Sequence, residues 1–164
     1  MNNKVIILTG EKQTGKTTLL QQFCNQQNNI AGILTPVVNG KRMFYDIAGK
    51  EFFAMEASAD EKSLAIGKYL FSAAAFVKAN TVLLEVSKST GLEFLILDEI
   101  GPLEIKQQKG LYECFKEILL SNFAYTLIVV IRQGLIEDAI KHFNLNDVVV
   151  LSIAKMKKYL RIVL

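Results

Sequence analysis

The chain has 164 residues, of which 51% are apolar and 21% charged, and its formal net charge is +3. This balance predicts one globular domain over residues 1–164 and excludes a low-complexity or repeat protein. No apolar run reaches the roughly 18 residues of a membrane span. Asn2 and Asn3 lead directly into the first expected strand, which leaves no room for a signal peptide. The two cysteines, Cys24 and Cys114, have no metal or redox spacing, so we expect buried free thiols and a cytoplasmic location.

The first expected elements surround a phosphate-binding loop. Residues 10–17 read GEKQTGKT, a complete G-x-x-x-x-G-K-T pattern, between a β-branched stretch at Lys4–Thr9 and helical spacing from Lys16 to about Gln27. A strand, a glycine loop and a helix N-terminus together present N–H groups and positive partial charge to an anion. In this loop Lys16 reaches the β- and γ-phosphates, and the Thr17 hydroxyl ligates Mg²⁺. We expect the phosphate-binding residues to be Gly10, Glu11, Lys12, Gln13, Thr14, Gly15, Lys16, Thr17 and Thr18.

Strands and helices then alternate, with one antiparallel interruption. Pro36 closes the second strand, and the Asn39-Gly40 turn leads into a small β-meander. The expected strands lie at residues 30–36, 42–47, 51–55, 68–71, 93–97, 125–131 and 147–151, and the expected helices at 73–88, about 109–120 and 135–143. This order predicts a three-layer α/β/α fold whose mostly parallel central sheet carries a small antiparallel meander insertion.

Two adjacent acids, Asp98 and Glu99, follow the apolar strand at residues 93–97. Ligands of an open parallel sheet bind beyond the carboxyl ends of its strands, so we expect both acids near the phosphate loop. Asp98 suits a Mg²⁺ ligand, while Glu99 points elsewhere and can polarise a water for attack on the γ-phosphate. The pair favours a hydrolase that activates water over a protein that only binds nucleotide.

Other charged residues are weaker candidates. Arg132 follows the strand at residues 125–131, where it can read the γ-phosphate and stabilise transition-state charge, or simply pair with a carboxylate on the surface. Arg42 is a weaker candidate for the same task. Glu104 is the last residue of an expected tight turn over residues 100–104, and it either assists the site or lies in solvent. His142, the only histidine, is expected to have a structural role.

Two further groups of residues have alternative interpretations. Tyr45, Phe52 and Phe53 can stack on a nucleobase, although packing of the meander is favoured. The basic segment at residues 155–161 is expected to be a solvated face whose apolar residues Met156, Tyr159 and Leu160 pack against the domain, with nucleic-acid contact as the alternative. We expect a monomer.

Three stretches make the sequence similar to the THEP-type nucleoside-triphosphatase family: residues 10–18, residues 31–42 and the more family-specific residues 97–104. The resemblance implies a RecA-like P-loop domain that uses Mg²⁺ to hydrolyse ATP, GTP and other nucleoside triphosphates to diphosphates. It implies phosphate-loop roles for Gly10, Gly15, Lys16 and Thr17, a metal-site role for Asp98 and the role of catalytic base for Glu99.

Two other functions are compatible with a phosphate loop. The first is a P-loop kinase that phosphorylates a nucleoside, nucleotide or other small acceptor. Such kinases usually close an arginine-rich lid over the phosphoryl group, whereas this chain has only Arg42, Arg132 and Arg161. The second is a non-enzymatic switch or partner-binding module. The sequence favours hydrolysis over both.

Overall fold

The strand that precedes the phosphate loop lies inside a mostly parallel sheet. The computed structural model describes residues 4–162; residues 1–3, expected to lead into the first strand, and residues 163–164 lie outside the described part. The sheet has the order β10-β1-β9-β8-β2-β4-β3, with β5 paired to β4. Its parallel strands are β1 (Lys4–Thr9), β2 (Ile30–Leu34), β8 (Phe94–Leu97), β9 (Thr126–Val130) and β10 (Val149–Ser152).

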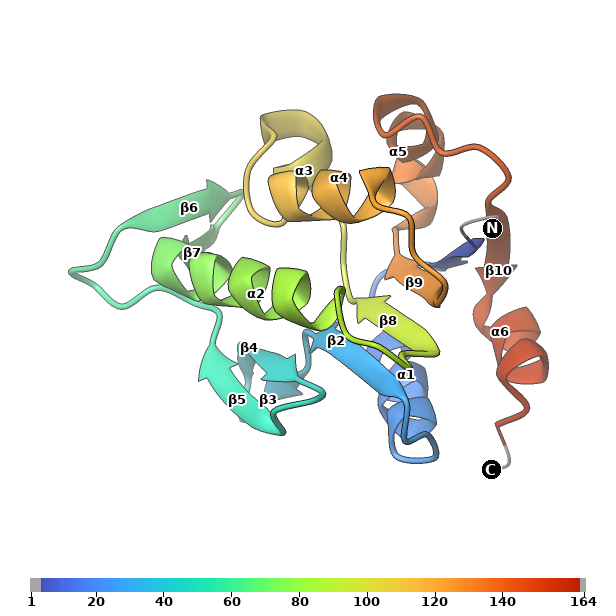
Figure 1. Cartoon of the computed structure of the whole chain (residues 1–164). Coiled ribbons are helices and arrows are strands. Elements are labelled where there is room, and N and C mark those ends of the chain that lie inside the picture. Colours follow the sequence, from blue (N-terminus) through green and yellow to red (C-terminus); the bar gives the residue numbers. More distant parts are fainter. Residues whose placement is uncertain (1–3, 163–164) are drawn as a thin grey trace.

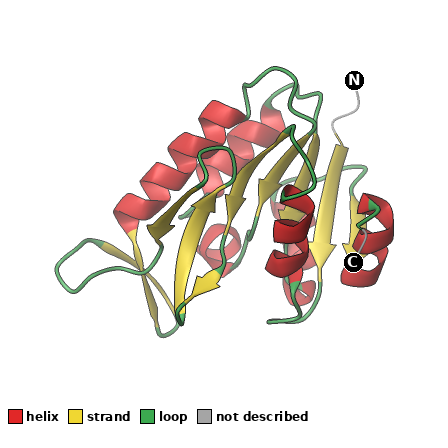
Figure 2. Ribbon diagram, turned by 90° about the horizontal axis from the view of Figure 1, so that it is seen from below, coloured by secondary structure: helices red, strands yellow, loops and turns green. Residues whose placement is uncertain are grey.

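Helices cover both faces of the central sheet (Figures 1 and 2). In β1, Ile6 and Leu8 join one buried cluster, and Val5 and Ile7 join the other, as the two-residue period of a strand requires. The first cluster includes α1 (Lys16–Cys24) and α6 (Ile153–Leu160). The second includes α2 (Ala73–Val86), α3 (Pro102–Gln107), α4 (Tyr112–Leu120) and α5 (Ile136–His142). The predicted three-layer fold is confirmed.

The antiparallel part of the sheet is the expected β-meander. It comprises β3 (Val37–Val38), β4 (Lys41–Asp46) and β5 (Glu51–Ala54). Asn39 and Gly40 both have positive φ, as a tight hairpin turn requires. A separate hairpin of β6 (Ser63–Ile66) and β7 (Tyr69–Ser72) projects beside α2 in both views. The sequence predicted only the second of these strands, because four residues of alternation in β6 are too short a signal.

The prediction of a tight turn over residues 100–104 is wrong, because α3 begins at Pro102. Pro102 occupies the first helical position, where the absence of an N–H costs nothing, so it starts the helix instead of ending a loop. Gln108 ends α3 in a left-handed conformation, and the next helix begins at Tyr112, not at Lys109.

Several other boundaries differ by a few residues. α1 was predicted to reach about Gln27 but ends at Cys24. The next residue, Asn25, caps the helix, and its N–H donates to the carbonyl of Gln21. β10 begins at Val149 because Asp147 has a φ of 57°. A 3₁₀ turn, η1 (Gln133–Leu135), precedes α5. Within the described residues, no helix is both long and apolar enough to cross a membrane.

Gly32 allows β2 to approach β8 closely. Its φ is +127°, and a Cβ built there would lie 2.1 Å from the backbone oxygen of Ile96. Only glycine combines this backbone conformation with this proximity. The two strands therefore end side by side, so that the chain after β2 and the acids after β8 reach the same edge of the sheet.

Candidate active site

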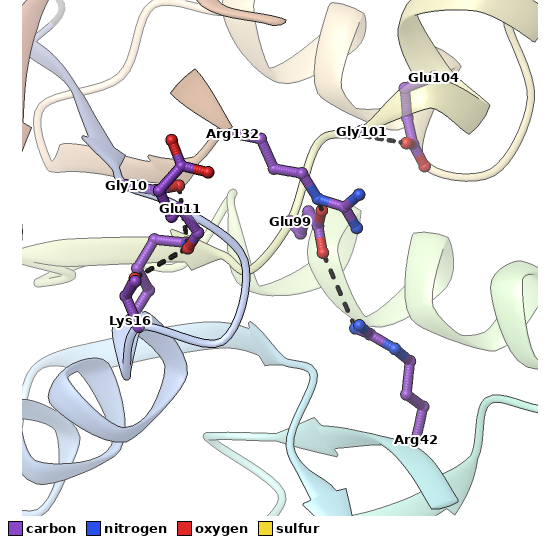
Figure 3. A network of polar contacts seen from close by, with 9 residues as sticks. Gly10, Glu11, Lys16, Arg42, Glu99, Gly101, Glu104 and Arg132 are labelled. Atoms are coloured by element: carbon purple, nitrogen blue, oxygen red, sulfur yellow. Dashed lines mark hydrogen bonds and ion pairs between the residues drawn. The ribbon is translucent and has the colours of Figure 1, made fainter. Parts of the chain in front are cut away.

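The phosphate loop connects β1 to the N-terminus of α1. Gly15, which precedes the helix, has φ 91° and ψ 20°, a left-handed conformation that glycine adopts without strain. The Lys16 ammonium bonds the carbonyl oxygens of Gly10 at 3.2 Å and Glu11 at 2.5 Å (Figure 3). The Thr14 hydroxyl also donates to the Glu11 oxygen, at 2.8 Å. These bonds hold the lysine over the loop.

Asp98 lies at the end of β8 and is only 2% exposed. Its Oδ2 accepts a hydrogen bond from the backbone N–H of Thr35 at 3.0 Å. Burial raises the pKa of Asp98, and hydrogen bonds from Thr35 and the Thr17 side chain oppose that shift. A hydroxyl and a carboxylate are oxygen ligands suited to Mg²⁺. No group of three or more His, Cys, Asp or Glu forms a metal cluster within residues 4–162, so a cation here would need phosphate and water ligands as well.

Glu99 lies between two arginines from different elements (Figure 3). Arg132, just after β9, places Nε 2.6 Å from Oε1 of Glu99, and Arg42 of β4 places an Nη 3.8 Å from Oε2. The Glu99 Oε1 atom is buried and accepts no well-aligned hydrogen bond within residues 4–162, so its contact with Arg132 is an ion pair only. The site therefore combines a base with two cations.

A pocket of about 350 Å³ joins these groups. Of the predicted residues, those that line it are Lys12, Gln13, Thr14, Gly15, Lys16, Thr17, Thr18, Arg42, Asp98, Glu99 and Arg132. Gly10 and Glu11 do not line the pocket, and act on it through the carbonyl groups that bind Lys16. Thr35, which the sequence analysis did not single out, also lines it. The sequence could have indicated Thr35, because it directly follows β2, and neighbouring parallel strands end at the same edge of the sheet.

Glu104 is buried and does not lie in solvent. It is 4% exposed, and its two oxygens accept the backbone N–H groups of Gly101 at 2.9 Å and Leu111 at 3.0 Å. Burial is the main cause that raises the pKa of Glu104 to about 7; the two backbone bonds act against it. This carboxyl group caps α3 and ties it to the start of α4, and so the solvent interpretation is wrong.

The remaining candidates lie away from this pocket. Tyr45 packs against Phe52 at 4.5 Å between ring centroids and Phe53 against Phe44 at 5.3 Å, while Phe52 itself is 47% exposed. His142 contacts the rings of Tyr112 and Phe143.

The C-terminal segment and the cysteines mostly follow expectation. Met156 and Leu160 are buried in α6. Tyr159 is 39% exposed, and its ring and hydroxyl contact Lys4 of β1, which donates a hydrogen bond to the hydroxyl. Both cysteines are free; Cys114 is buried, whereas Cys24 is only partly so. Burial raises the pKa of each thiol to about 12.

Comparisons with known proteins show the family and the fold of this chain. A family model described as NTPase matches residues 5–161. The fold is similar to the crystal structure of THEP1 from the hyperthermophile Aquifex aeolicus, with a TM-score of 0.71 and 19% identity over 94% of this chain and 92% of that one. It is also similar to the solution structure of a human cancer-related nucleoside triphosphatase, with a TM-score of 0.66 and 20% identity over 94% and 91%. The comparison with curated proteins gave no match.

Proposed function

The chain belongs to the NTPase family, and we propose that it hydrolyses ATP, GTP and other nucleoside triphosphates to diphosphate and phosphate in a Mg²⁺-dependent reaction. The observation that carries this proposal is the position of Glu99. Its carboxylate borders the pocket that also contains Lys16, Asp98 and two arginines. A pocket built only to hold a nucleotide does not require a carboxylate at this position.

The phosphate loop would bind the nucleotide through its backbone N–H groups and Lys16. Residues 12–18 line the pocket and begin α1, so their N–H groups and the helix dipole attract the triphosphate. Thr17 and Asp98 would hold Mg²⁺, which neutralises phosphate charge when bound. Their hydroxyl and carboxylate oxygens support this assignment.

Glu99 would act as the general base. The oxygen of a water attacks the γ-phosphorus, its proton passes to Glu99, and the bond from the γ-phosphorus to the oxygen bridging the β-phosphate breaks. The diphosphate leaves with the bonding electrons. The ion pairs with Arg132 and Arg42 would hold the Glu99 carboxylate beside the pocket. Both arginines would also stabilise the negative charge that develops on the γ-phosphoryl group.

Further properties belong to the same proposal. We expect a monomeric cytoplasmic enzyme with one domain over residues 1–164 and two free cysteines. The exposed Lys155 and Lys158 of α6 would form a solvated face, with nucleic-acid contact as the less favoured alternative. A P-loop kinase is the second candidate. Two of the three arginines already pair with Glu99, and Arg161 is exposed at the end of α6, which favours hydrolysis over a kinase with an arginine-rich lid.

The test is phosphate release by the purified chain with Mg²⁺ and each nucleoside triphosphate in turn, with no acceptor present. Steady release from several nucleotides, abolished by EDTA, is the expected result. A protein that binds ATP but releases no phosphate under any of these conditions would contradict the proposal. Preparations of the Lys16→Ala variant, purified in parallel, control for contaminating phosphatases.

A further inference from the structure

A second pocket adjoins the phosphate pocket at Glu99. Its volume is about 210 Å³, and both pockets are bordered by Lys12, Thr35, Arg42, Glu99 and Arg132. It extends between the β6–β7 hairpin, α2 and α3, on the opposite side of the sheet from α1. Its inner wall is apolar and includes Phe44, Met55, Phe71, Phe76 and Leu103.

This pocket opens at the γ-phosphate end of the nucleotide site. In a phosphate loop the backbone N–H groups hold the α- and β-phosphates, and the lysine reaches the β- and γ-phosphates. The second pocket includes no residue from 13 to 18, but it includes Glu99 and both arginines. The nucleoside extends from the α-phosphate, away from the γ end, so this pocket is not positioned to hold the base of the same nucleotide.

The size and lining of the pocket define the chemistry of its occupant. A dry apolar cavity of about 150 Å³ binds benzene, so 210 Å³ has room for one ring with a short substituent. Glu99 is the carboxylate among the polar residues that border both pockets, and its Oε2 lies 3.8 Å from the Arg42 nitrogen, beyond hydrogen-bond distance. A hydroxyl group on the occupant would donate a hydrogen bond to this Oε2 atom.

We propose that this pocket binds a small alcohol with a ring-sized apolar body, and that the protein transfers the γ-phosphoryl group to its hydroxyl. The proposal rests on the proposed function, because both reactions use the same bound nucleotide, Glu99 and arginines. The hydroxyl oxygen attacks the γ-phosphorus and its proton passes to Glu99. The bond to the β-phosphate oxygen breaks, and the products are a phosphate monoester and the nucleoside diphosphate. The apolar body displaces water from Glu99, so transfer competes with hydrolysis.

The experiment uses the full chain with Mg²⁺ and ATP labelled in the γ-phosphate. Benzyl alcohol and 2-phenylethanol are the probes, toluene is the control without a hydroxyl, and glycerol is the control without an apolar body. Chromatography separates labelled monoester from labelled inorganic phosphate, and titration calorimetry with a non-hydrolysable ATP analogue measures probe binding. We expect monoester from the two aromatic alcohols and from neither control.

Two variants of the β6–β7 hairpin locate the effect. Ile66 lines the pocket, so Ile66→Trp should fill it and lower both probe binding and the ratio of monoester to inorganic phosphate at least tenfold. Leu70, 55% exposed on the same hairpin and outside the pocket lining, provides the matched control Leu70→Trp, for which both readouts should equal those of the unmodified chain.

The possible results separate the two proposals. Monoester formation that Ile66→Trp suppresses and Leu70→Trp does not supports the inference, even where hydrolysis without acceptor is absent. Inorganic phosphate as the sole labelled product with both aromatic alcohols overturns the inference and leaves the hydrolase proposal standing. Monoester formation that Ile66→Trp leaves unchanged also overturns it, because the acceptor then binds elsewhere. If neither labelled product forms, both proposals fail.

Discussion

Arg132 and Glu99 form an ion pair, with Nε of the arginine 2.6 Å from Oε1 of the glutamate. The two residues follow β9 and β8, which are neighbouring parallel strands. Parallel strands end at the same edge, so residues distant in sequence meet there. The sheet itself thus holds together the proposed base and a cation.

The first prediction concerns the role of Glu99. Glu99→Gln removes the proton acceptor and keeps nearly the same volume, so nucleotide affinity should be retained while kcat falls by about 10²-fold or more. Calorimetric binding of a non-hydrolysable analogue and steady-state phosphate release measure the two effects. Unchanged turnover would remove Glu99 from the mechanism.

Lys16 is expected to contribute to both binding and catalysis. Lys16→Ala should weaken triphosphate binding by roughly 10- to 100-fold, the loss of about 1.5–3 kcal/mol typical of a hydrogen bond to a charged group, and should lower kcat as well. Lys155→Ala, on the exposed face of α6, is the control. Wild-type affinity and turnover in Lys16→Ala would refute the phosphate-loop assignment.

Arg132 should act mainly in the transition state. Arg132→Ala is expected to lower kcat by about 10²-fold with a much smaller change in nucleotide affinity, because charge on the γ-phosphoryl oxygens grows during the reaction. Arg161→Ala, at the exposed end of α6, is the matched control. Equal losses of affinity and kcat/KM with kcat unchanged would instead indicate that Arg132 only binds the substrate.

Glu104 should make stability depend on pH. Its pKa is about 7 in the folded chain against an ordinary 4.5, so the folded state holds the proton more tightly than the unfolded state. The free energy of unfolding should therefore fall as pH rises from about 4.5 through 7, by up to about 3 kcal/mol.

Glu104→Gln tests this dependence, because glutamine carries no ionisable proton. Denaturant titrations from pH 4.5 to 8 should show that the unmodified chain loses stability relative to Glu104→Gln over this interval. Glu113→Gln, exposed on α4, is the control variant. Parallel pH profiles for the unmodified chain and Glu104→Gln would contradict the prediction.

Gly32 should tolerate no side chain. A Cβ at this position would lie 2.1 Å from the backbone oxygen of Ile96, so Gly32→Ala must separate β2 from β8. We expect a loss of at least about 3 kcal/mol in thermal or denaturant unfolding. Gly134→Ala, where a Cβ would meet nothing within 4 Å, should change stability little. Similar losses in both variants would show that the approach of β2 to β8 is not the cause.

The phosphate site was largely predictable because its information is local. The spacing in residues 10–17 prescribes a loop conformation, and the apolar runs on both sides prescribe the strand and helix that hold it. The position of Asp98 and Glu99 was also predictable, since the edge rule needs only the end of an apolar strand. Short elements such as α3 and β6 were missed because their few residues carry no clear periodicity.

Strand periodicity and one continuous motif therefore predict the three-layer fold and the residues at the edge of its sheet. Only the tertiary structure decided which charges meet: Arg42 and Arg132 both pair with Glu99, while Glu104 is buried against Gly101 and Leu111. The second pocket likewise exists only in the folded chain, because its walls come from β4, the β6–β7 hairpin, α2 and α3. Such contacts depend on how elements that are far apart in the sequence pack together, and no local sequence pattern encodes that packing.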